Sequence, residues 1–423
     1  MDPNAILGDI SRTEIFLIES IPLLATAIVL YILIKILNLN SRAAAPVVKC
    51  KDSKFNCEVK KSCPILHEIY QPTLLWGKSG HIQTYVYAKH GRFQKPAPRN
   101  RSRKSLVLPD KTTFTFDIFD PVANHSSKED YTICIAPGIA NCSENSYIEV
   151  FAWYGQQQGY RVVVLNHLGV LKSLKLTSPR IFTYGDTDEY AGMVEYVLKN
   201  YPSSKLIAVG FSMGANTVVK YLGEKPERQR HFECVVSVCQ GYDITKASYV
   251  LHEWEGLRRL YCFMMAENLK KHIRRNSYML FGEGAKTYRQ KHSAPDVFYD
   301  VEQIYKSTSL VHIDEHLNRK MLGFDSLNDF YRWCSSSNHI HKIYIPMLML
   351  NSEDDALIPP KYNDTPEAYI QTADKAMHVT TKHGGHLGFY EGGYIKANCV
   401  TWMERMCFQY IDAVVELNAN AEL

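Results

Sequence analysis

Residues 205–216 constrain the fold of this chain more than any other stretch. They begin as a short apolar run, pass through Gly210-Phe-Ser-Met-Gly and lead into residues 215–223, which are suited to a helix. A strand, a G-x-S-x-G turn and a helix in this order form a nucleophile elbow. Gly210 and Gly214 lack side chains, so the turn between strand and helix can close tightly. We therefore predict that Ser212 stands as a nucleophile at the edge of a sheet.

Short apolar runs and amphipathic segments alternate along most of the chain after residue 112. Continuous apolar strands that alternate with helices are typical of an α/β fold with a mostly parallel sheet covered on both faces. We expect a strand at 112–119 to pair with the strand at 131–136. Further strands are expected at 160–166, 206–211, 234–239, 347–351 and 377–381, and helices at 147–157, 188–201 and 402–417.

Two regions depart from this alternation. Residues 244–344 contain no Val-rich run but many aromatic, Met and basic residues at helical spacing, which predicts a helical insertion where a lid would lie. Residues 70–84 are rich in Gly and Pro, and we expect no helix there.

The N-terminal region contains the longest apolar stretch of the sequence. Residues 15–39 are dominated by Leu, Ile, Val and Ala, and a bilayer core requires roughly 20 such residues. The domain plan is therefore a tail at 1–14, a transmembrane signal-anchor at 15–39, a linker at 40–61 and a main domain at 62–423. Lys and Arg are more frequent after the span than before it, which favours a cytosolic main domain.

Composition leaves the compartment open and excludes other functions. Four N-x-S/T sequons would be glycosylated only outside the cytosol, and the eleven Cys show no disulfide framework. The net charge of +4 is too small to indicate a nucleic-acid-binding protein. The candidate N-glycosylation positions are Asn100, Asn124, Asn141 and Asn363.

A base and an acid for Ser212 are expected after later strands, in the chain order Ser, acid, His. Asp355 follows the strand at 347–351, and His386 follows the strand at 377–381. An imidazole is needed to take the serine proton, and a carboxylate is needed to orient the imidazole. Asp354 and Asp243 are alternative acids and His383 is an alternative base, although the glycines before His386 favour that residue.

Two further groups of residues are candidates for functional roles. The backbone N–H groups of Met213 and Ile139 are expected to form an oxyanion hole. His125 and Asp130 have the H-x4-D spacing associated with some acyltransferases. His383 and His386 lack an evident third ligand, so neither a metal nor another cofactor is expected.

These motifs resemble the AB hydrolase 4 family of the AB hydrolase superfamily. The resemblance covers residues 62–406 and is carried by the elbow, by Asp355 and by four further segments. Those segments are Trp76-Gly-Lys-Ser-Gly-His-Ile-Gln-Thr84, Thr177-Ser-Pro-Arg180, Val236-Ser-Val-Cys-Gln-Gly241 and His383-Gly-Gly-His-Leu-Gly-Phe389.

The resemblance implies an alpha/beta-hydrolase fold and membrane-anchored ester hydrolysis. It makes Ser212, Asp355 and His386 the charge-relay residues and implies monoacylglycerol lipase activity on membrane lipid. It also implies type II single-pass topology, opposite to the charge count, at the plasma membrane or endoplasmic reticulum. One relative that this chain resembles carries H-x4-D and is described as steroid-responsive, which implies a possible steroid effector. Ala356 stands where such a relative has Pro. An acyltransferase and a non-catalytic lipid or steroid receptor are the alternative functions.

Overall fold

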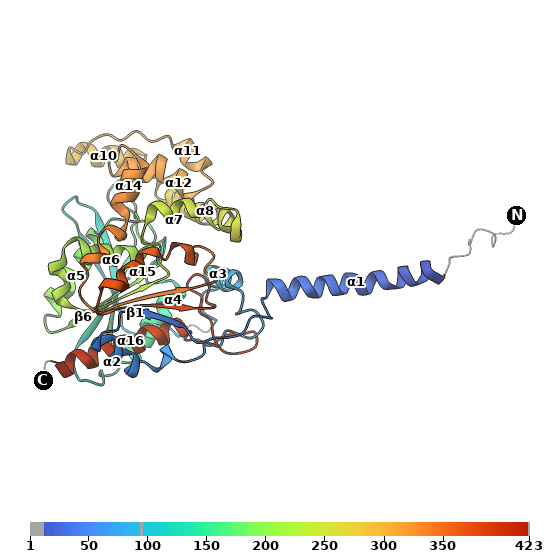
Figure 1. Ribbon diagram of the computed structural model, residues 1–423. Coiled ribbons are helices and arrows are strands. Elements are labelled where there is room, and N and C mark those ends of the chain that lie inside the picture. The colour runs from blue at the N-terminus through green and yellow to red at the C-terminus, as the bar shows by residue number, and fades with distance from the viewer. Residues whose placement is uncertain (1–11, 94–95, 422–423) are drawn as a thin grey trace.

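A sheet forms the centre of the molecule (Figure 1). It has nine strands in the order β1-β9-β8-β7-β6-β4-β5-β3-β2. The computed structural model describes residues 12–93 and 96–421, and the sheet lies within them. The strands are β1 (Val47–Cys50), β2 (Arg101–Val107), β3 (Thr113–Phe119), β4 (Tyr131–Ala136), β5 (Arg161–Asn166), β6 (Lys205–Phe211), β7 (Phe232–Val238), β8 (Met347–Ser352) and β9 (Ala376–Thr381).

The interior of this sheet is parallel, as predicted. Strands β5, β4, β6, β7, β8 and β9 run in one direction, whereas β1, β3 and β2 pair with their neighbours in antiparallel fashion at the two edges. The carboxyl ends of parallel strands meet at one edge of a sheet. Side chains that follow β4, β6, β8 and β9 are therefore brought together there.

Helices cover both faces of the sheet, and each face has its own apolar core. One core contains side chains of α5 (Asp188–Asn200), α6 (Met213–Glu224) and α15 (Asp364–Thr372). The other contains side chains of α2 (Lys54–Ser62), α4 (Ser146–Gln157) and α16 (Trp402–Ala421). Burial on both faces explains why the central strands read as continuous apolar runs.

The chain between β7 and β8 is helical and covers one end of the sheet as a cap (Figure 1). Its helices α8, α7 and α12 face the carboxyl edge of the strands. The cap comprises α7 (Ile244–Val250), α8 (Arg258–Arg275), α9 (Ser277–Leu280), α10 (Glu283–His292), α11 (Val301–Lys306), α12 (Leu310–Ile313), α13 (Arg319–Met321) and α14 (Leu327–Cys334).

The expected pairing of the strand at 112–119 with the strand at 131–136 is wrong. Strand β3 lies between β2 and β5, with Thr115 opposite Asn166, and β5 separates it from β4. Strand β2, absent from the predicted strands, adds to this edge. The Arg103 guanidinium on β2 lies 2.7 Å from the buried Asp117 carboxylate on β3.

Two expectations for the region before β2 are also wrong. Residues 40–61 do not form a plain linker, because they contain β1 and most of α2. Helix α3 (Gly80–Lys89) begins within the segment at 70–84, where no helix was expected. Gly80 is the first residue of this helix, and a side chain there would collide with the Asp354 carbonyl oxygen, which lies 2.1 Å from the position of a Cβ.

Helix α1 (Arg12–Ile36) projects away from the rest of the molecule (Figure 1). It ends three residues before the predicted span does. In residues 12–93 and 96–421, no helix has both the length and the apolarity that a membrane crossing requires. The predicted transmembrane segment at 15–39 is therefore not supported, and most of the tail at 1–14 lies outside the described residues.

Candidate active site

Ser212 lies at the sharp turn between β6 and α6, in a backbone conformation that few residues adopt. Its φ is 53° and its ψ is −118°, and its N–H donates to the Val238 carbonyl at 2.8 Å. A Cβ on Gly214 would come within 2.0 Å of the Ala136 carbonyl oxygen, and one on Gly210 within 2.3 Å of Ala215 Cα. The two glycines thus allow the close packing that holds this strained turn.

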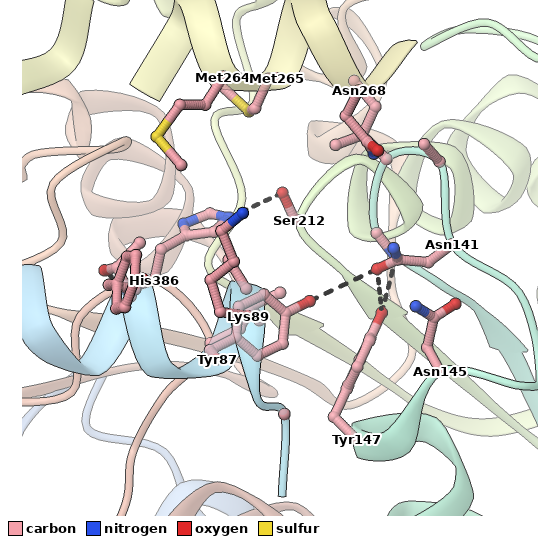
Figure 2. A pocket seen from close by; sticks show the side chains of 18 of the residues that line it. Tyr87, Lys89, Asn141, Asn145, Tyr147, Ser212, Met264, Met265, Asn268 and His386 are labelled. Atoms are coloured by element: carbon pink, nitrogen blue, oxygen red, sulfur yellow. Dashed lines mark hydrogen bonds between the residues drawn. The ribbon is translucent and has the colours of Figure 1, made fainter. Parts of the chain in front are cut away.

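His386 is brought to Ser212 by the loop that follows β9. Its Nε2 lies 2.9 Å from Ser212 Oγ (Figure 2). Its Nδ1 lies 2.8 Å from Asp355 Oδ2. With the proton on Nδ1, the serine hydroxyl donates to Nε2 and the imidazole donates to the carboxylate. The backbone N–H of His386 donates to Thr84 Oγ1 at 2.9 Å. Both ends of the imidazole are therefore occupied in the manner that general-base catalysis requires.

Asp355 is the carboxylate that meets His386, and its other oxygen is held by the backbone. Oδ1 accepts from the N–H groups of Leu357 at 2.8 Å and Ile358 at 2.9 Å, and the side chain is fully buried. The two backbone donors fix the orientation of the carboxylate. Oδ2, the other oxygen of Asp355, is thereby directed at the His386 imidazole.

The alternative acids and the alternative base take other partners. Asp354 Oδ1 accepts from the Gly385 N–H at 2.8 Å, and Asp243 caps α7 by accepting from the Lys246 N–H at 3.1 Å. His383 Nε2 lies 3.1 Å from Ser41 Oγ. The structure therefore brings Ser212, His386 and Asp355 together and leaves the three alternatives out of that chain.

The loop after β4 lies beside Ser212 and carries the second expected oxyanion donor, Ile139. Its conformation is fixed on both sides, since the Gly138 N–H donates to the Tyr147 hydroxyl and His167 Nε2 donates to the Pro137 carbonyl, both at 2.9 Å.

Met213 is the first residue of α6, so its N–H is one of the donors that a helix start leaves unpaired. Ile139 and Ser212 line the same cavities, as the oxyanion prediction requires.

A cavity of about 480 Å³ opens beside Ser212 and His386 (Figure 2). Helix α8 of the cap contributes Met264, Met265 and Asn268 to its wall. The opposite wall is polar, and the Asn141 Oδ1 there accepts from the Tyr147 hydroxyl at 3.1 Å. A cavity of this size accommodates a small organic molecule.

A second cavity, of about 90 Å³, also borders Ser212 and is mostly apolar. It runs beneath the cap and is lined by Ile244, Ala247, Leu251 and Leu310. Ser212, Ile139 and His386 border both cavities. Ser212 thus borders one space with polar and apolar walls and a second space that is mostly apolar.

Several residues around the site were not recognised as such from the sequence. Thr84 and Gln83 belong to the family segment at 76–84, and both hold the histidine loop. Gln83 Oε1 accepts from the Tyr390 N–H at 2.8 Å, while Thr84 bonds to His386. His167 and Tyr147 belong to no recognised sequence motif. They hold the loop after β4 only because the fold brings distant segments together.

His125 and Asp130 lie far from Ser212. Both precede β4, whose six residues span about 20 Å, whereas Ser212 follows the carboxyl end of the neighbouring β6. His125 Nε2 bonds to the Tyr160 hydroxyl at 3.0 Å, and Asp130 pairs with Arg161 at 2.8 Å. The two residues have structural partners and do not join the site.

The four sequons differ in accessibility. Asn100 and Asn124 are exposed. Asn141 is half-buried and hydrogen-bonded beside Ser212, and Asn363 is buried. Burial leaves no room for a glycan on the Asn363 side chain, which corrects the expectation at that position.

One group of described residues has the spacing of metal ligands. The ligand atoms of Cys239, Asp355 and His386 lie within 4.8 Å of one another. Asp355 and His386 already bond to each other. Burial, together with the charge of Asp355, raises the pKa of the Cys239 thiol well above its usual range, which disfavours the thiolate that a metal would bind.

Comparison with known proteins identifies the family. A profile described as alpha/beta hydrolase fold matches residues 131–393. The chain belongs to the alpha/beta hydrolase family. It is 42% identical to "Monoacylglycerol lipase ABHD2" of Homo sapiens over 99% of this chain and 96% of that protein. It is 44% identical to the Danio rerio protein of the same name over 94% of this chain and 90% of that protein. The Drosophila melanogaster "Abhydrolase domain-containing protein 2" is 38% identical over 93% of this chain and 96% of that protein.

We expect His167 to make the stability of this alpha/beta hydrolase depend on pH. Burial lowers the pKa of His167 from 6.5 to about 4. Between these values the unfolded state binds a proton that the native state does not, so the free energy of unfolding decreases as pH falls. The loss attributable to His167 between pH 6.5 and pH 5 is up to about 2 kcal/mol.

Urea denaturation at both pH values, with wild type and His167→Gln, measures this loss. A Gln can still donate to the Pro137 carbonyl but does not titrate, so we expect the variant to lose less stability than wild type over this range. Equal pH dependence in the two proteins would contradict the assignment.

Proposed function

We propose that this chain is a serine-dependent carboxylic ester hydrolase that cleaves fatty acyl esters of glycerol. The observation that carries the proposal is the hydrogen-bonded chain from Ser212 Oγ through His386 to Asp355, at 2.9 and 2.8 Å, beside a substrate-sized cavity. Similarity to proteins named monoacylglycerol lipase supports the substrate class.

The mechanism begins with attack of Ser212 Oγ on the ester carbonyl. His386 Nε2 takes the hydroxyl proton, and Asp355 stabilises the imidazolium that forms. The carbonyl oxygen becomes an oxyanion, which the N–H groups of Met213 and Ile139 stabilise together with the positive end of α6. The carbon–oxygen bond to glycerol then breaks, and the glycerol oxygen takes the proton from Nε2. An acyl group remains on Ser212.

The second half of the reaction releases the fatty acid. His386 Nε2 removes a proton from a water molecule, whose oxygen attacks the acyl carbon. The bond from the acyl carbon to Ser212 Oγ breaks, and the serine oxygen recovers a proton from His386. Each turnover consumes one ester and one water and restores the enzyme.

The two cavities suggest how an acylglycerol is oriented. The polar wall near Asn141 and Tyr147 suits hydroxyl groups of glycerol, which both donate and accept hydrogen bonds. The apolar cavity lined by Ile244, Ala247 and Leu251 suits the first part of a fatty acyl chain. Ser212 borders both cavities, where the ester bond of such a substrate would be.

Acyl transfer to an alcohol or thiol would use the same acyl-enzyme. His125 and Asp130, whose spacing was the specific argument for acyl transfer, lie too far from Ser212 to take part in the reaction. A steroid effector and a receptor without turnover rest on resemblance alone. Hydrolysis is therefore the function that the geometry supports best.

The apolar surface of α1 also favours attachment to lipid, which we include in the proposal. Leu23 and Leu24 are 74% and 63% exposed, and most of their described neighbours on this helix are exposed as well. A continuous apolar surface of this kind marks a site of protein or membrane contact. Lipid contact would bring the enzyme to substrates that partition into membranes.

Labelling with a fluorophosphonate tests the proposed nucleophile and acid. We expect the probe to label wild type at Ser212 and to leave Ser212→Ala unlabelled. Asp355→Asn should reduce kcat for monoacylglycerol hydrolysis by about 10³- to 10⁴-fold, because the imidazole loses its orientation. The matched control Asp243→Asn should stay within a few-fold of wild type. Labelling of Ser212→Ala at the wild-type level would refute the proposal.

Substitution in the apolar cavity tests the acyl site. Ala247→Phe fills the space beside Ser212, so we expect the KM for a long-chain monoacylglycerol to rise about tenfold or more, since a kilocalorie-scale packing loss has that effect. Hydrolysis of a short acetate ester should change little. Tyr249→Phe, an exposed position on the same helix, is the control. An equal effect on long and short esters would argue against this acyl site.

Flotation with phosphatidylcholine vesicles tests lipid attachment. We expect the wild-type chain to float with vesicles, and Leu24→Asp combined with Leu30→Asp to reduce the bound fraction, because two charges on α1 oppose burial in lipid. Tyr278→Asp, which alters an exposed residue of the cap, should float like wild type. Unchanged binding of the α1 variant would exclude this helix as the attachment site.

A further inference from the structure

A second series of contacts among Ser, His and Asp side chains lies close to the series formed by Ser212, His386 and Asp355. His383 Nε2 is 3.1 Å from Ser41 Oγ, and His383 Nδ1 is 3.6 Å from Asp354 Oδ2. Asp354 Oδ1 accepts from the Gly385 N–H at 2.8 Å. Gly385 immediately precedes His386, so this series of contacts ends at the backbone next to the proposed general base.

In the contact between His383 and Asp354, each residue presents a buried polar atom that has no other hydrogen-bond partner among the described residues. His383 Nδ1 and Asp354 Oδ2 are buried, and neither has a hydrogen-bond partner elsewhere in residues 12–93 and 96–421. A buried polar atom without a partner costs free energy, so each favours an approach of the other. With the proton on Nδ1, His383 faces the carboxylate and accepts the Ser41 hydroxyl at Nε2.

The loop that carries His383 and His386 packs closely against the start of α3. A Cβ on Gly385 would come within 2.4 Å of the Gly80 carbonyl oxygen, and one on Gly80 would meet the Asp354 carbonyl oxygen. Ser352 Oγ donates to the Gly385 carbonyl at 2.8 Å. Gly385 is thus held by its N–H, by its carbonyl and by the backbone of α3. Asp354 therefore contacts the histidine loop one residue before His386.

Ser41 joins this arrangement to the segment that follows α1. The Asn38 side chain donates to the Lys78 carbonyl at 3.0 Å, and Lys78 Nζ donates to the Leu39 carbonyl at 3.2 Å. The segment leaving α1 is thus fixed against the loop before α3. Ser41 lines neither cavity beside Ser212, so its hydroxyl is placed to hold His383 and not to attack a substrate.

We propose that Ser41, His383 and Asp354 are positioning residues that hold the His386 loop in its reactive geometry and tie it to the segment leaving α1. The inference rests on the proposed function, since His386 acts on Ser212. The N-terminal segment then contributes to the rate of the reaction as well as to the location of the enzyme. Removal of the Asp354 carboxylate frees the Gly385 N–H and lets the imidazole move from Ser212 Oγ.

The rate of Ser212 labelling by a fluorophosphonate, measured on the full chain, tests this role together with kcat and KM. We expect Asp354→Ala to slow labelling and lower kcat by more than about tenfold, because small misplacements of a catalytic group have large effects on rate. KM should stay within about twofold, since Asp354 lines neither cavity. Asp354→Asn keeps an oxygen acceptor for Gly385 and should recover most of the rate.

Ser41 supplies an independent test that does not depend on the fate of the Asp354 variants. We expect Ser41→Ala to slow labelling about threefold and Ser41→Thr, which keeps the hydroxyl, to match wild type. In the double variant Ser41→Ala with Asp354→Ala, labelling should be no slower than in Asp354→Ala alone. The loss of Asp354 already interrupts the series of contacts from Ser41 to Gly385. Glu353→Ala, which removes the exposed neighbouring carboxylate, should label like wild type.

Thermal unfolding of each variant separates positioning from stability. A purely structural role predicts a lower unfolding temperature with labelling at the wild-type rate at 20 °C, and that result would overturn the proposal. Additive effects of Ser41→Ala and Asp354→Ala, or equally slow Asp354→Asn and Asp354→Ala, would overturn it as well. Absence of Ser212 labelling in wild type would instead refute the proposed function.

Discussion

The approach of α6 to the carboxyl end of β4 is the constraint on which the site depends. Gly214 packs against the Ala136 carbonyl so closely that no side chain fits between them. This contact fixes the strained backbone of Ser212 and places the start of α6 beside the loop that carries Ile139. One packing contact thus sets the positions of the proposed nucleophile, the helix dipole and the expected oxyanion donors. The histidine and aspartate then need only short loops to reach it.

The side chains around this contact support the proposal of a substrate with two unlike ends. The cap closes over the carboxyl edge of the sheet and supplies apolar side chains to one cavity beside Ser212. Polar side chains of α4 and the loop before it line the other cavity. The histidine loop is held from behind by Arg92, whose guanidinium donates to the Gly388 carbonyl and pairs with the buried Glu404 at 2.7 Å.

The sequence predicts the interior of this fold well and its edges poorly. Buried strands such as β6 and β8 are continuous apolar runs, and the residues after them follow the order Ser, acid, His. Strands β1 and β2 are short or rich in charge, and β2 is held partly by the ion pair of Arg103 with Asp117. The pairing of β3 with β5 depends on topology, which no local pattern encodes. The same holds for Ser41 and His383, which lie 342 residues apart in sequence.

Identification of the acyl-enzyme tests the central claim most directly. Wild-type protein mixed with a monoacylglycerol and quenched in acid within milliseconds is digested and analysed by mass spectrometry. The account predicts a fatty acyl group, of the mass supplied by the substrate, on the peptide that contains Ser212, and none in Ser212→Ala. An acyl group on another residue, or monoacylglycerol turnover by Ser212→Ala at the wild-type rate, would contradict it.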